Sequence, residues 1–186
     1  LGLRQIDRQE RLIQNLLMGH RLRFAEGSLE SQRLEPLRLI ERLLRERGGV
    51  GHRGCAFALN GGAGLGVFAD TEALQTIVEN LLEIALRYGA ETVHVGLDRE
   101  DENWVKLSVR DDGQGFEPER AEEIFGPFRR AAPDVRGTGL GLPLSRSLAE
   151  AMGGTLAGVS AGLGRGAEFT LRLRAADMKG SEDDSA

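Results

Sequence analysis

Two glycine-rich motifs constrain the fold of this 186-residue sequence more than any other feature. The first, Asp111-Asp112-Gly113-Gln114-Gly115, directly follows residues 104–110, whose alternation of apolar and polar residues predicts a half-buried strand. The second, Gly137-Thr138-Gly139-Leu140-Gly141-Leu142, directly precedes the apolar stripe of a helix predicted at 139–152. The fold must therefore place one glycine loop at the end of a strand and the other at the start of a helix.

The residue types in these motifs suit a flat, amine-bearing ligand that also carries an anion. An ionised Asp111 only accepts hydrogen bonds, so its carboxylate is a good partner for an exocyclic amine such as that of adenine. Gly113 and Gly115 have no Cβ and let the backbone turn sharply beside a flat ring. The glycines of the second motif expose backbone N–H groups before a helix N-terminus, where phosphate binds well. Each motif alone is weak, because glycine turns are common, and the signal comes from the pair in this order.

Composition and charge argue against several classes of protein. A net charge of −5 speaks against a nucleic-acid partner, because binding to a phosphate backbone normally requires a basic face. The single cysteine, Cys55, allows no internal disulfide and no cysteine zinc cluster. The sequence has no run of about 18 apolar residues, so we expect a cytoplasmic chain. Because it starts at Leu1 within a helical pattern, we expect a fragment of a longer protein, which leaves room for a membrane anchor upstream.

Hydrophobic periodicity predicts a mixed order of helices and strands. The helices are expected at 3–24, from Pro36 to Gly48-Gly49, at 71–88 and at 139–152. The strands are expected at 55–59 and 65–69, joined as a hairpin by residues 61–64, at 92–98 and 104–110 as an antiparallel pair, and at 155–160 and 167–173. This order favours an α+β fold with an antiparallel or mixed sheet and helices on one face.

Together with two further segments, the glycine motifs resemble the conserved boxes of sensor histidine kinases. The catalytic domain of that family belongs to the superfamily of DNA gyrase and the ninety-kilodalton heat-shock chaperones. The resemblance runs from about Asp70 to Arg174, with four boxes in the family's order. They are an asparagine box, VENLLEIALRY at 78–88, a first glycine box, DDGQGF at 111–116, a phenylalanine box, IFGPFR at 124–129, and a second glycine box, GTGLGL at 137–142. Residues 164–169, GRGAEF, are similar to the family's last glycine turn.

The resemblance implies a fold and a division into domains. The fold is a two-layer α/β sandwich, the Bergerat ATP-binding fold, with ATP between helices and sheet. Residues 1–27 would be the end of the dimerisation and phosphoacceptor hairpin, 28–174 the catalytic domain, and 175–186 a mobile acidic tail. In the family that hairpin pairs with a second chain, so a homodimer is expected; the alternative is that Leu3, Ile6, Ile13 and Leu16 pack on this domain.

The resemblance also assigns nucleotide-binding residues. Asp111 is the safest of them, while the arginines between the phenylalanine box and the second glycine box have an equal alternative as a solvated basic loop. Phe125 and Phe128 are expected to anchor the lid, the connection between these two boxes, by packing. The ATP-binding residues are expected to be Asn80, Arg87, Tyr88, Asp111, Gly113, Gly115, Arg129, Arg130, Gly137, Thr138, Gly139, Leu140 and Gly141.

Two positions depart from the family's pattern. On the helix at 71–88 the core stripe is expected to consist of Leu74, Ile77, Leu81 and Ala85. Asn80, Ile84 and Arg87 share one sector at its edge. The family usually has a second asparagine where this chain has Ile84, and its amide oxygen is the usual protein ligand for Mg²⁺. Isoleucine has no lone pair, whereas Mg²⁺ requires octahedral oxygen coordination, so Asn80 is the remaining candidate metal ligand. Ala167 replaces a residue that commonly carries a hydroxyl group.

The phosphoacceptor is expected outside the sequence. His20, His52 and His94 all lack the family's context of a helical histidine followed by an acidic residue and a downstream proline. The expected function is therefore to bind ATP and transfer its γ-phosphoryl group to a histidine upstream, from which a response regulator receives it. The alternative is a degenerate module with weak or absent Mg²⁺-ATP use, which signals by conformation or by protein interaction.

Overall fold

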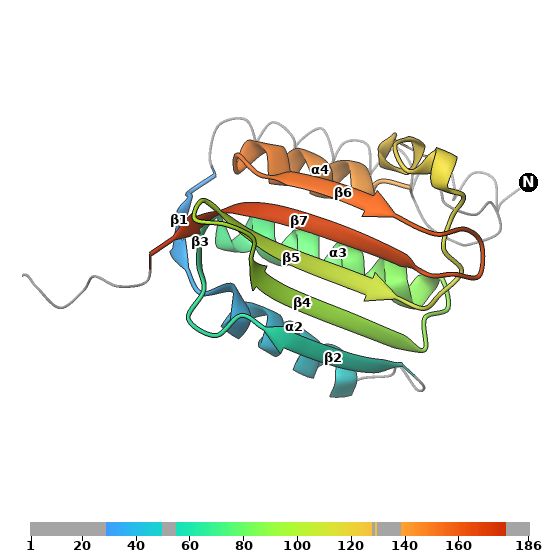
Figure 1. Ribbon diagram of the computed structural model, residues 1–186, viewed down its shortest axis with the longest axis horizontal. Coiled ribbons are helices and arrows are strands. Elements are labelled where there is room, and N and C mark those ends of the chain that lie inside the picture. Colours follow the sequence, from blue (N-terminus) through green and yellow to red (C-terminus); the bar gives the residue numbers. More distant parts are fainter. Residues whose placement is uncertain (1–28, 50–54, 128, 130–138, 178–186) are drawn as a thin grey trace, which may run out of the picture.

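The computed structural model describes residues 29–49, 55–127, 129 and 139–177. They form two layers, a mixed β-sheet and a layer of three helices that covers one of its faces (Figure 1). The helices are α2 (Pro36–Gly49), α3 (Thr71–Arg87) and α4 (Gly141–Ala151). The strands are β1 (Gln32–Leu34), β2 (Ala56–Gly61), β3 (Gly66–Ala69), β4 (Thr92–Arg99), β5 (Trp104–Asp111), β6 (Thr155–Val159) and β7 (Ala167–Ala176). The α+β sandwich expected from the sequence is confirmed.

The strand order is β1-β3-β7-β5-β4-β2, and β6 pairs with β7 beside this path. The antiparallel pair β4–β5 is confirmed, with Val95 opposite Val109. The expected hairpin of residues 55–59 and 65–69 is wrong, because β2 pairs in parallel with β4 at one end of the sheet while β3 pairs with β7 and β1 near the other. The glycines between them permit this separation: a Cβ on Gly62, whose φ is +87°, would lie 2.6 Å from Cδ2 of Leu97.

The core lies between the sheet and the helices. Alternate residues of the central strands point into it, as do the residues of α3 expected to form the core stripe, and both sets are almost fully buried. They are Val93, Val95, Leu97, Val105, Leu107, Val109, Phe169, Leu171 and Leu173 from the strands, and Leu74, Ile77, Leu81 and Ala85 from α3. Apolar burial of this kind is the main stabilising contribution, at roughly 25 cal/mol per Å² removed from water. It fixes α3 and its asparagine box on the sheet.

The start of α3 is capped by Asp70. Its Oδ1 accepts a hydrogen bond from the backbone N of Ala73 at 2.8 Å, a contact that contributes about 1 kcal/mol in typical helices. Its Oδ2 accepts from the backbone N of Glu30 at 3.0 Å. The segment that leads into β1, a strand that the sequence did not predict, is thereby tied to the helix that carries the asparagine box. At the other end of the chain β7 continues to Ala176, so the sheet includes the first two residues assigned to the tail.

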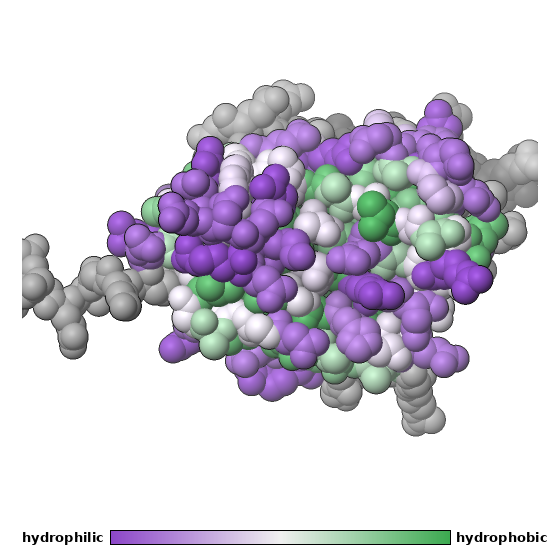
Figure 2. Space-filling view, viewed as in Figure 1, coloured by the Kyte–Doolittle hydropathy of each residue, from purple (hydrophilic) through white to green (hydrophobic). Residues whose placement is uncertain are grey.

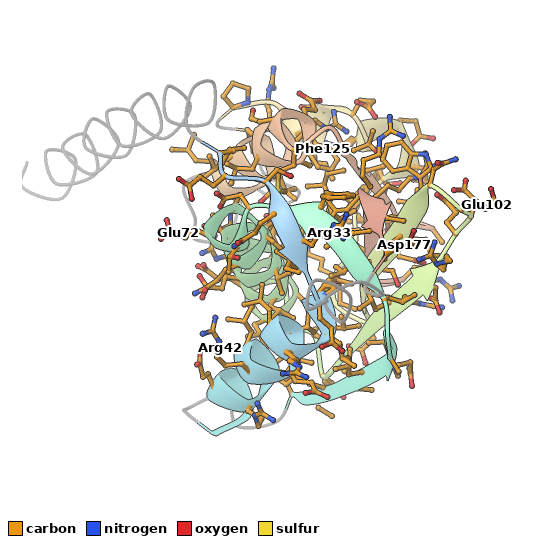
Figure 3. All side chains as sticks on the ribbon, turned by 90° about the vertical axis from the view of Figure 1, so that its left-hand side faces the viewer. Arg33, Arg42, Glu72, Glu102, Phe125 and Asp177 are labelled. Carbon is orange, nitrogen blue, oxygen red and sulfur yellow. The ribbon has the colours of Figure 1, made fainter. Side chains whose placement is uncertain are left out.

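The second face of the sheet carries polar and charged side chains. Figure 2 shows hydrophilic side chains gathered toward the end where β5 begins and β7 ends. There the ring of Trp104 is in contact with Arg172 and Arg174, whose guanidinium carbons are 5.0 and 4.4 Å from its centroid. Trp104 therefore packs on the sheet face. Edge-on, Arg42 and Glu72 project from the helix layer and Glu102 lies on the sheet side (Figure 3). Among the helices described, none has the length and apolar character needed to cross a bilayer.

Candidate nucleotide site

Asp111 is the last residue of β5 and is buried. Its Oδ1 accepts a hydrogen bond from the backbone N of Gly113 at 2.9 Å, which closes the turn of the first glycine box. Burial raises the pKa of Asp111 above its ordinary value, and the neighbouring Asp112 carboxylate adds to this effect. Backbone N–H groups of Gly113 and Ala167 oppose it by hydrogen bonding to the ionised form. A buried acceptor therefore stands at the strand end, as the sequence predicted.

Asp112, the next residue, has a different environment. It is exposed, and its Oδ1 accepts from the backbone N of Glu91 at 2.8 Å and of Thr92 at 2.9 Å. These hydrogen bonds lower the pKa of Asp112, the bond from Thr92 contributing most. Adjacent carboxylates thus have separate tasks: Asp112 secures the start of β4, and Asp111 is held beside the glycine turn.

The glycines of the first box lie against other backbone segments. A Cβ on Gly113 would lie 2.7 Å from the carbonyl oxygen of Tyr88, and one on Gly115 would lie 2.6 Å from that of Gly166. The loop at 160–166 is hydrogen-bonded to the box, with Gly166 N donating to Gly113 O at 3.0 Å and Gly164 N to Gln114 O at 2.6 Å. Besides the ligand access expected from the sequence, these glycines permit close contact between two loops.

Asn80 connects the asparagine box to the second glycine box. Its Nδ2 donates to Oγ of Ser145 at 3.1 Å and to the carbonyl oxygen of Gly141 at 3.4 Å. Ser145 is fully buried on α4, and sequence reasoning missed it. The available signal was a hydroxyl residue within the apolar stripe of that helix. The two bonds occupy the amide nitrogen of Asn80, so its Oδ1 is the atom of that side chain suited to a cation.

Three further residues of the asparagine box lie close to Asn80 in sequence. Ile84, which replaces the usual metal ligand, is partly buried and packs against the core. Arg87 forms an ion pair with Glu83. Tyr88 caps the helix, and its carbonyl oxygen accepts from the backbone N of Gln114 at 2.9 Å, which joins the asparagine box to the first glycine box. Within the described ranges, no group of three or more histidine, cysteine, aspartate or glutamate side chains could hold a metal ion.

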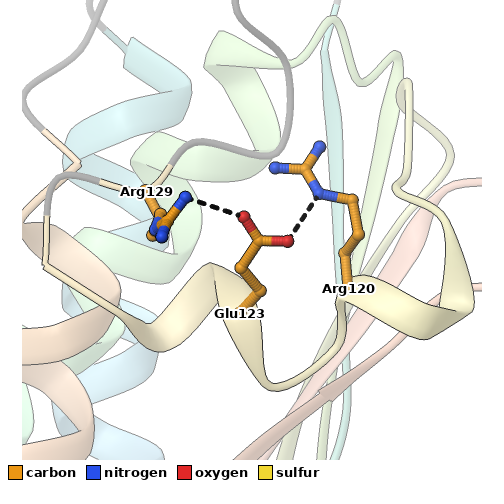
Figure 4. Close-up of polar contacts among 3 residues, drawn as sticks. All are labelled: Arg120, Glu123 and Arg129. Atoms are coloured by element: carbon orange, nitrogen blue, oxygen red, sulfur yellow. Dashed lines mark hydrogen bonds and ion pairs between the residues drawn. The ribbon is translucent and has the colours of Figure 1, made fainter.

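The segment at 118–129, which leads into the lid and is called the lid base below, carries a small charge network in its described part (Figure 4). Arg129 Nη1 lies 3.2 Å from Glu123 Oε1, and Arg120 Nε lies 3.3 Å from Glu123 Oε2. The Arg129 side chain is 62% exposed, so its pair with Glu123 contributes at most about 1 kcal/mol and can be exchanged for another anion. Phe125 is buried, as expected for a lid anchor.

The second glycine box is described from Gly139 onward. Gly139 has a φ of +69°, Leu140 is buried at the cap of α4, and Gly141 begins the helix. Of the other residues expected in or near the site, Arg130, Gly137, Thr138 and Phe128 lie outside the described residues, as do His20, His52 and the helix at 3–24. His94 is exposed on β4.

The fold and the order of the boxes define a class, a two-layer domain of the nucleotide-binding type, in which the candidate residues lie on α3, at the start of α4 and at the end of β5. The comparison with protein families makes this specific. Residues 69–177 match the family described as histidine kinase-, DNA gyrase B-, and HSP90-like ATPase, and the chain belongs to that family.

Individual relatives place the chain among sensor kinases. The sensor protein RstB of Escherichia coli is 42% identical over 106 residues, which are 55% of this chain and 24% of that protein. The sensor protein KdpD of Mycobacterium tuberculosis is 33% identical over 161 residues, 81% of this chain and 18% of that protein. The structure of full-length ShkA in complex with AMPPNP is 27% identical with a TM-score of 0.72, and the match covers 89% of this chain and 35% of that one.

The chain thus spans a quarter or less of the length of these two curated relatives. The family match and these relatives confirm the resemblance to the ATP-binding domain of sensor histidine kinases that the four boxes predicted.

Proposed function

We propose that this domain binds ATP and transfers the γ-phosphoryl group to a histidine upstream of the catalytic domain, from which an aspartate of a response regulator receives it. The observation that carries the proposal is the pair of hydrogen bonds from Asn80 to Gly141 and Ser145. They hold the asparagine box against the start of α4, where backbone N–H groups are suited to phosphate. Phosphoryl transfer depends mainly on positioning and charge neutralisation, and this junction supplies the positioning.

In this proposal the residues divide into an adenine end and a phosphate end. Asp111 accepts a hydrogen bond from the adenine amine, and Gly113, Gly115 and Tyr88 line the ring. The phosphates lie at the start of α4 and are contacted by the remaining assigned residues: Arg87, Arg129, Arg130, Gly137, Thr138, Gly139, Leu140 and Gly141. Support comes from the burial of Asp111 at a strand end and from the weak, exchangeable pairing of Arg129 with Glu123.

The proposal also includes Mg²⁺. When bound, Mg²⁺ would neutralise charge on the phosphates. Asn80 would hold it through Oδ1, since Nδ2 is occupied by Gly141 and Ser145. Ile84, one turn later, offers no oxygen, so the remaining coordination would come from phosphate and water. This single hydrophobic substitution is the observation that favours the second candidate function, a degenerate module with weak Mg²⁺-ATP use; the sensor-kinase relatives favour the first.

For the longer protein, we propose a homodimer that forms through residues 1–27, with a response regulator as its further partner. Support comes from the amphipathic pattern of residues 3–24 and from the names of the relatives, two of which are sensor proteins.

Replacing Ile84 with asparagine tests the metal assignment. We expect the Ile84→Asn variant to bind ATP about tenfold more tightly than the unaltered protein when Mg²⁺ is present, because it restores an oxygen ligand. Without Mg²⁺ the two proteins should bind ATP equally. Titration with a fluorescent ATP analogue, with and without Mg²⁺, measures both, and Ile84→Val is the matched control that changes the side chain without adding an oxygen.

Two outcomes would change the proposal. Tight, strictly metal-dependent binding by the unaltered protein would remove the case for a degenerate module. If neither protein binds any adenine nucleotide, the ATP site itself is wrong.

A further inference from the structure

One arginine outside the four boxes joins three segments around the lid base. Arg146 lies on α4, and its side chain is 24% exposed. Its Nη1 and Nη2 donate to the two carboxylate oxygens of Glu122 at 2.8 and 3.4 Å, and its Nε donates to the carbonyl oxygen of Leu156 on β6 at 3.2 Å. Its guanidinium carbon lies 3.6 Å from the ring centroid of Phe125. A single side chain thus contacts the phenylalanine box, the turn before it and a strand.

These contacts need the shape of a guanidinium group. The planar fork donates in two directions while its face lies on an aromatic ring, which the single ammonium group of lysine cannot do. The hydrogen bond from Arg146 and its charge hold the pKa of Glu122 below its ordinary value. Since the Arg146 side chain is only 24% exposed, its contacts with Phe125 and with the carbonyl oxygen of Leu156 are shielded from solvent, whereas its partner Glu122 is exposed.

Phe125 is also linked by ring packing to the first glycine box, at the proposed adenine end of the site. Its ring packs edge-on against Phe169 of β7, with centroids 6.4 Å apart, and Phe169 packs against Phe116 of the first glycine box at 6.3 Å. Gly158 makes room for this packing, because a Cβ there would lie 2.8 Å from Cε1 of Phe169. The lid base is therefore held between α4 on one side and the first glycine box on the other.

We infer that Arg146 is a positioning residue for the phosphates of ATP, an inference that rests on the proposed function. Arg146 lies five residues after Gly141, where α4 begins, and it holds Phe125 and Glu122 against that helix. Arg129 follows Phe125 by four residues and is the described lid arginine assigned to phosphate. Arg146 thereby fixes the phenylalanine box relative to the start of α4. It thus sets how far Arg129 lies from phosphates bound at the start of that helix. It does not touch the nucleotide itself.

The comparison of ATP with adenosine separates positioning from general stability. Adenosine has the amine that Asp111 would bind and lacks the phosphates that Arg129 and the start of α4 would contact. Loss of Arg146 should therefore weaken ATP binding and leave adenosine binding nearly unchanged. A residue that only stabilises the fold would affect both ligands alike.

The experiment uses the whole 186-residue chain and measures the dissociation constants of ATP and adenosine by calorimetry, with the melting temperature of each variant. Arg146→Met keeps the aliphatic stem and removes the charge; we expect about fivefold weaker ATP binding and less than a twofold change for adenosine. Arg146→Lys should recover part of the ATP affinity. Glu122→Gln, which leaves Arg146 and its stacking in place, should weaken ATP binding about twofold. Arg45→Met, an exposed arginine on α2, is the matched control and should bind both ligands as the unaltered chain does.

Equal loss of ATP and adenosine affinity would assign Arg146 a structural role only and overturn the inference. Unchanged ATP affinity in both Arg146→Met and Glu122→Gln would also overturn the inference. The proposed function would still stand in that case if the unaltered chain binds adenosine. If the unaltered chain binds neither ligand, the proposed function fails, and this inference fails with it.

Discussion

An Asp111→Asn variant should bind adenine nucleotides about 10- to 100-fold more weakly, the effect of losing a hydrogen bond to a charged group. The reason lies in the turn of the first glycine box. The backbone N of Gly113 donates to Oδ1 of Asp111, and an asparagine that keeps this bond must use its single oxygen for it. Its amide N–H groups would then face the adenine amine, donor against donor. Titration of ATP and adenosine measures the loss, which should be similar for both ligands because the change is at the adenine end.

Asp112→Asn is the matched control for this prediction. It makes the same chemical change one residue later, at an exposed carboxylate that accepts from Glu91 and Thr92 and lies outside the proposed contacts. We expect its nucleotide affinity to stay within about twofold of the unaltered protein, since the bonds it weakens belong to the start of β4. Full affinity in Asp111→Asn, with an unchanged melting curve, would show that Asp111 does not recognise adenine.

Replacing Gly166 with alanine should lower the free energy of unfolding by about 3 kcal/mol or more, the sum of a left-handed backbone cost and an overpacking cost. Gly166 has a φ of +68°, and a Cβ there would lie 2.0 Å from the carbonyl oxygen of Asp111. The backbone N of Gly166 also donates to the carbonyl oxygen of Gly113 at 3.0 Å. The clash would therefore separate the loop at 160–166 from the first glycine box. Chemical denaturation of the purified variant measures the loss.

Gly164 provides the control in the same loop. Its φ is +71°, nearly that of Gly166, but a Cβ there would meet no atom within 4 Å. Gly164→Ala should cost only about 1 kcal/mol, the backbone cost alone. The difference between the two variants isolates the steric contact with Asp111, and equal losses would mean that the loops do not pack as described.

Local sequence patterns predicted most of the fold. The alternation in β4 and β5, the core stripe of α3 and the start of α2 at Pro36 all depend on residues close together in the chain, and each is confirmed. The pairing of β2 with β4 could not be read in this way. Both partners of the expected hairpin carry apolar residues and flank a glycine loop, so local chemistry favours the hairpin, whereas the choice of a distant neighbour depends on how the whole sheet closes over the core.

The candidate site shows the same division. The boxes identified Asp111 and Asn80, but Ser145 and Arg146 act through partners 65 and 24 residues away in sequence, Asn80 and Glu122. A hydroxyl residue within an apolar stripe marks Ser145 as unusual, but the partners of Ser145 and Arg146 leave no periodic signal, because each contact depends on the approach of α4 to another segment. Gly113 and Gly115 were identified for a ligand-related reason, and the structure adds the loop packing that the sequence alone did not reveal.

The central claim, that this domain holds an adenine nucleotide through Asp111, is tested most directly by comparing ATP with GTP. Guanine has a carbonyl oxygen where adenine has its amine, and that oxygen would face the carboxylate of Asp111 without a proton between them. In calorimetric titrations of the unaltered protein, we predict saturable binding of ATP and ADP, with GTP at least about tenfold weaker. Equal affinity for ATP and GTP, or no saturable binding of adenine nucleotides, would contradict the account.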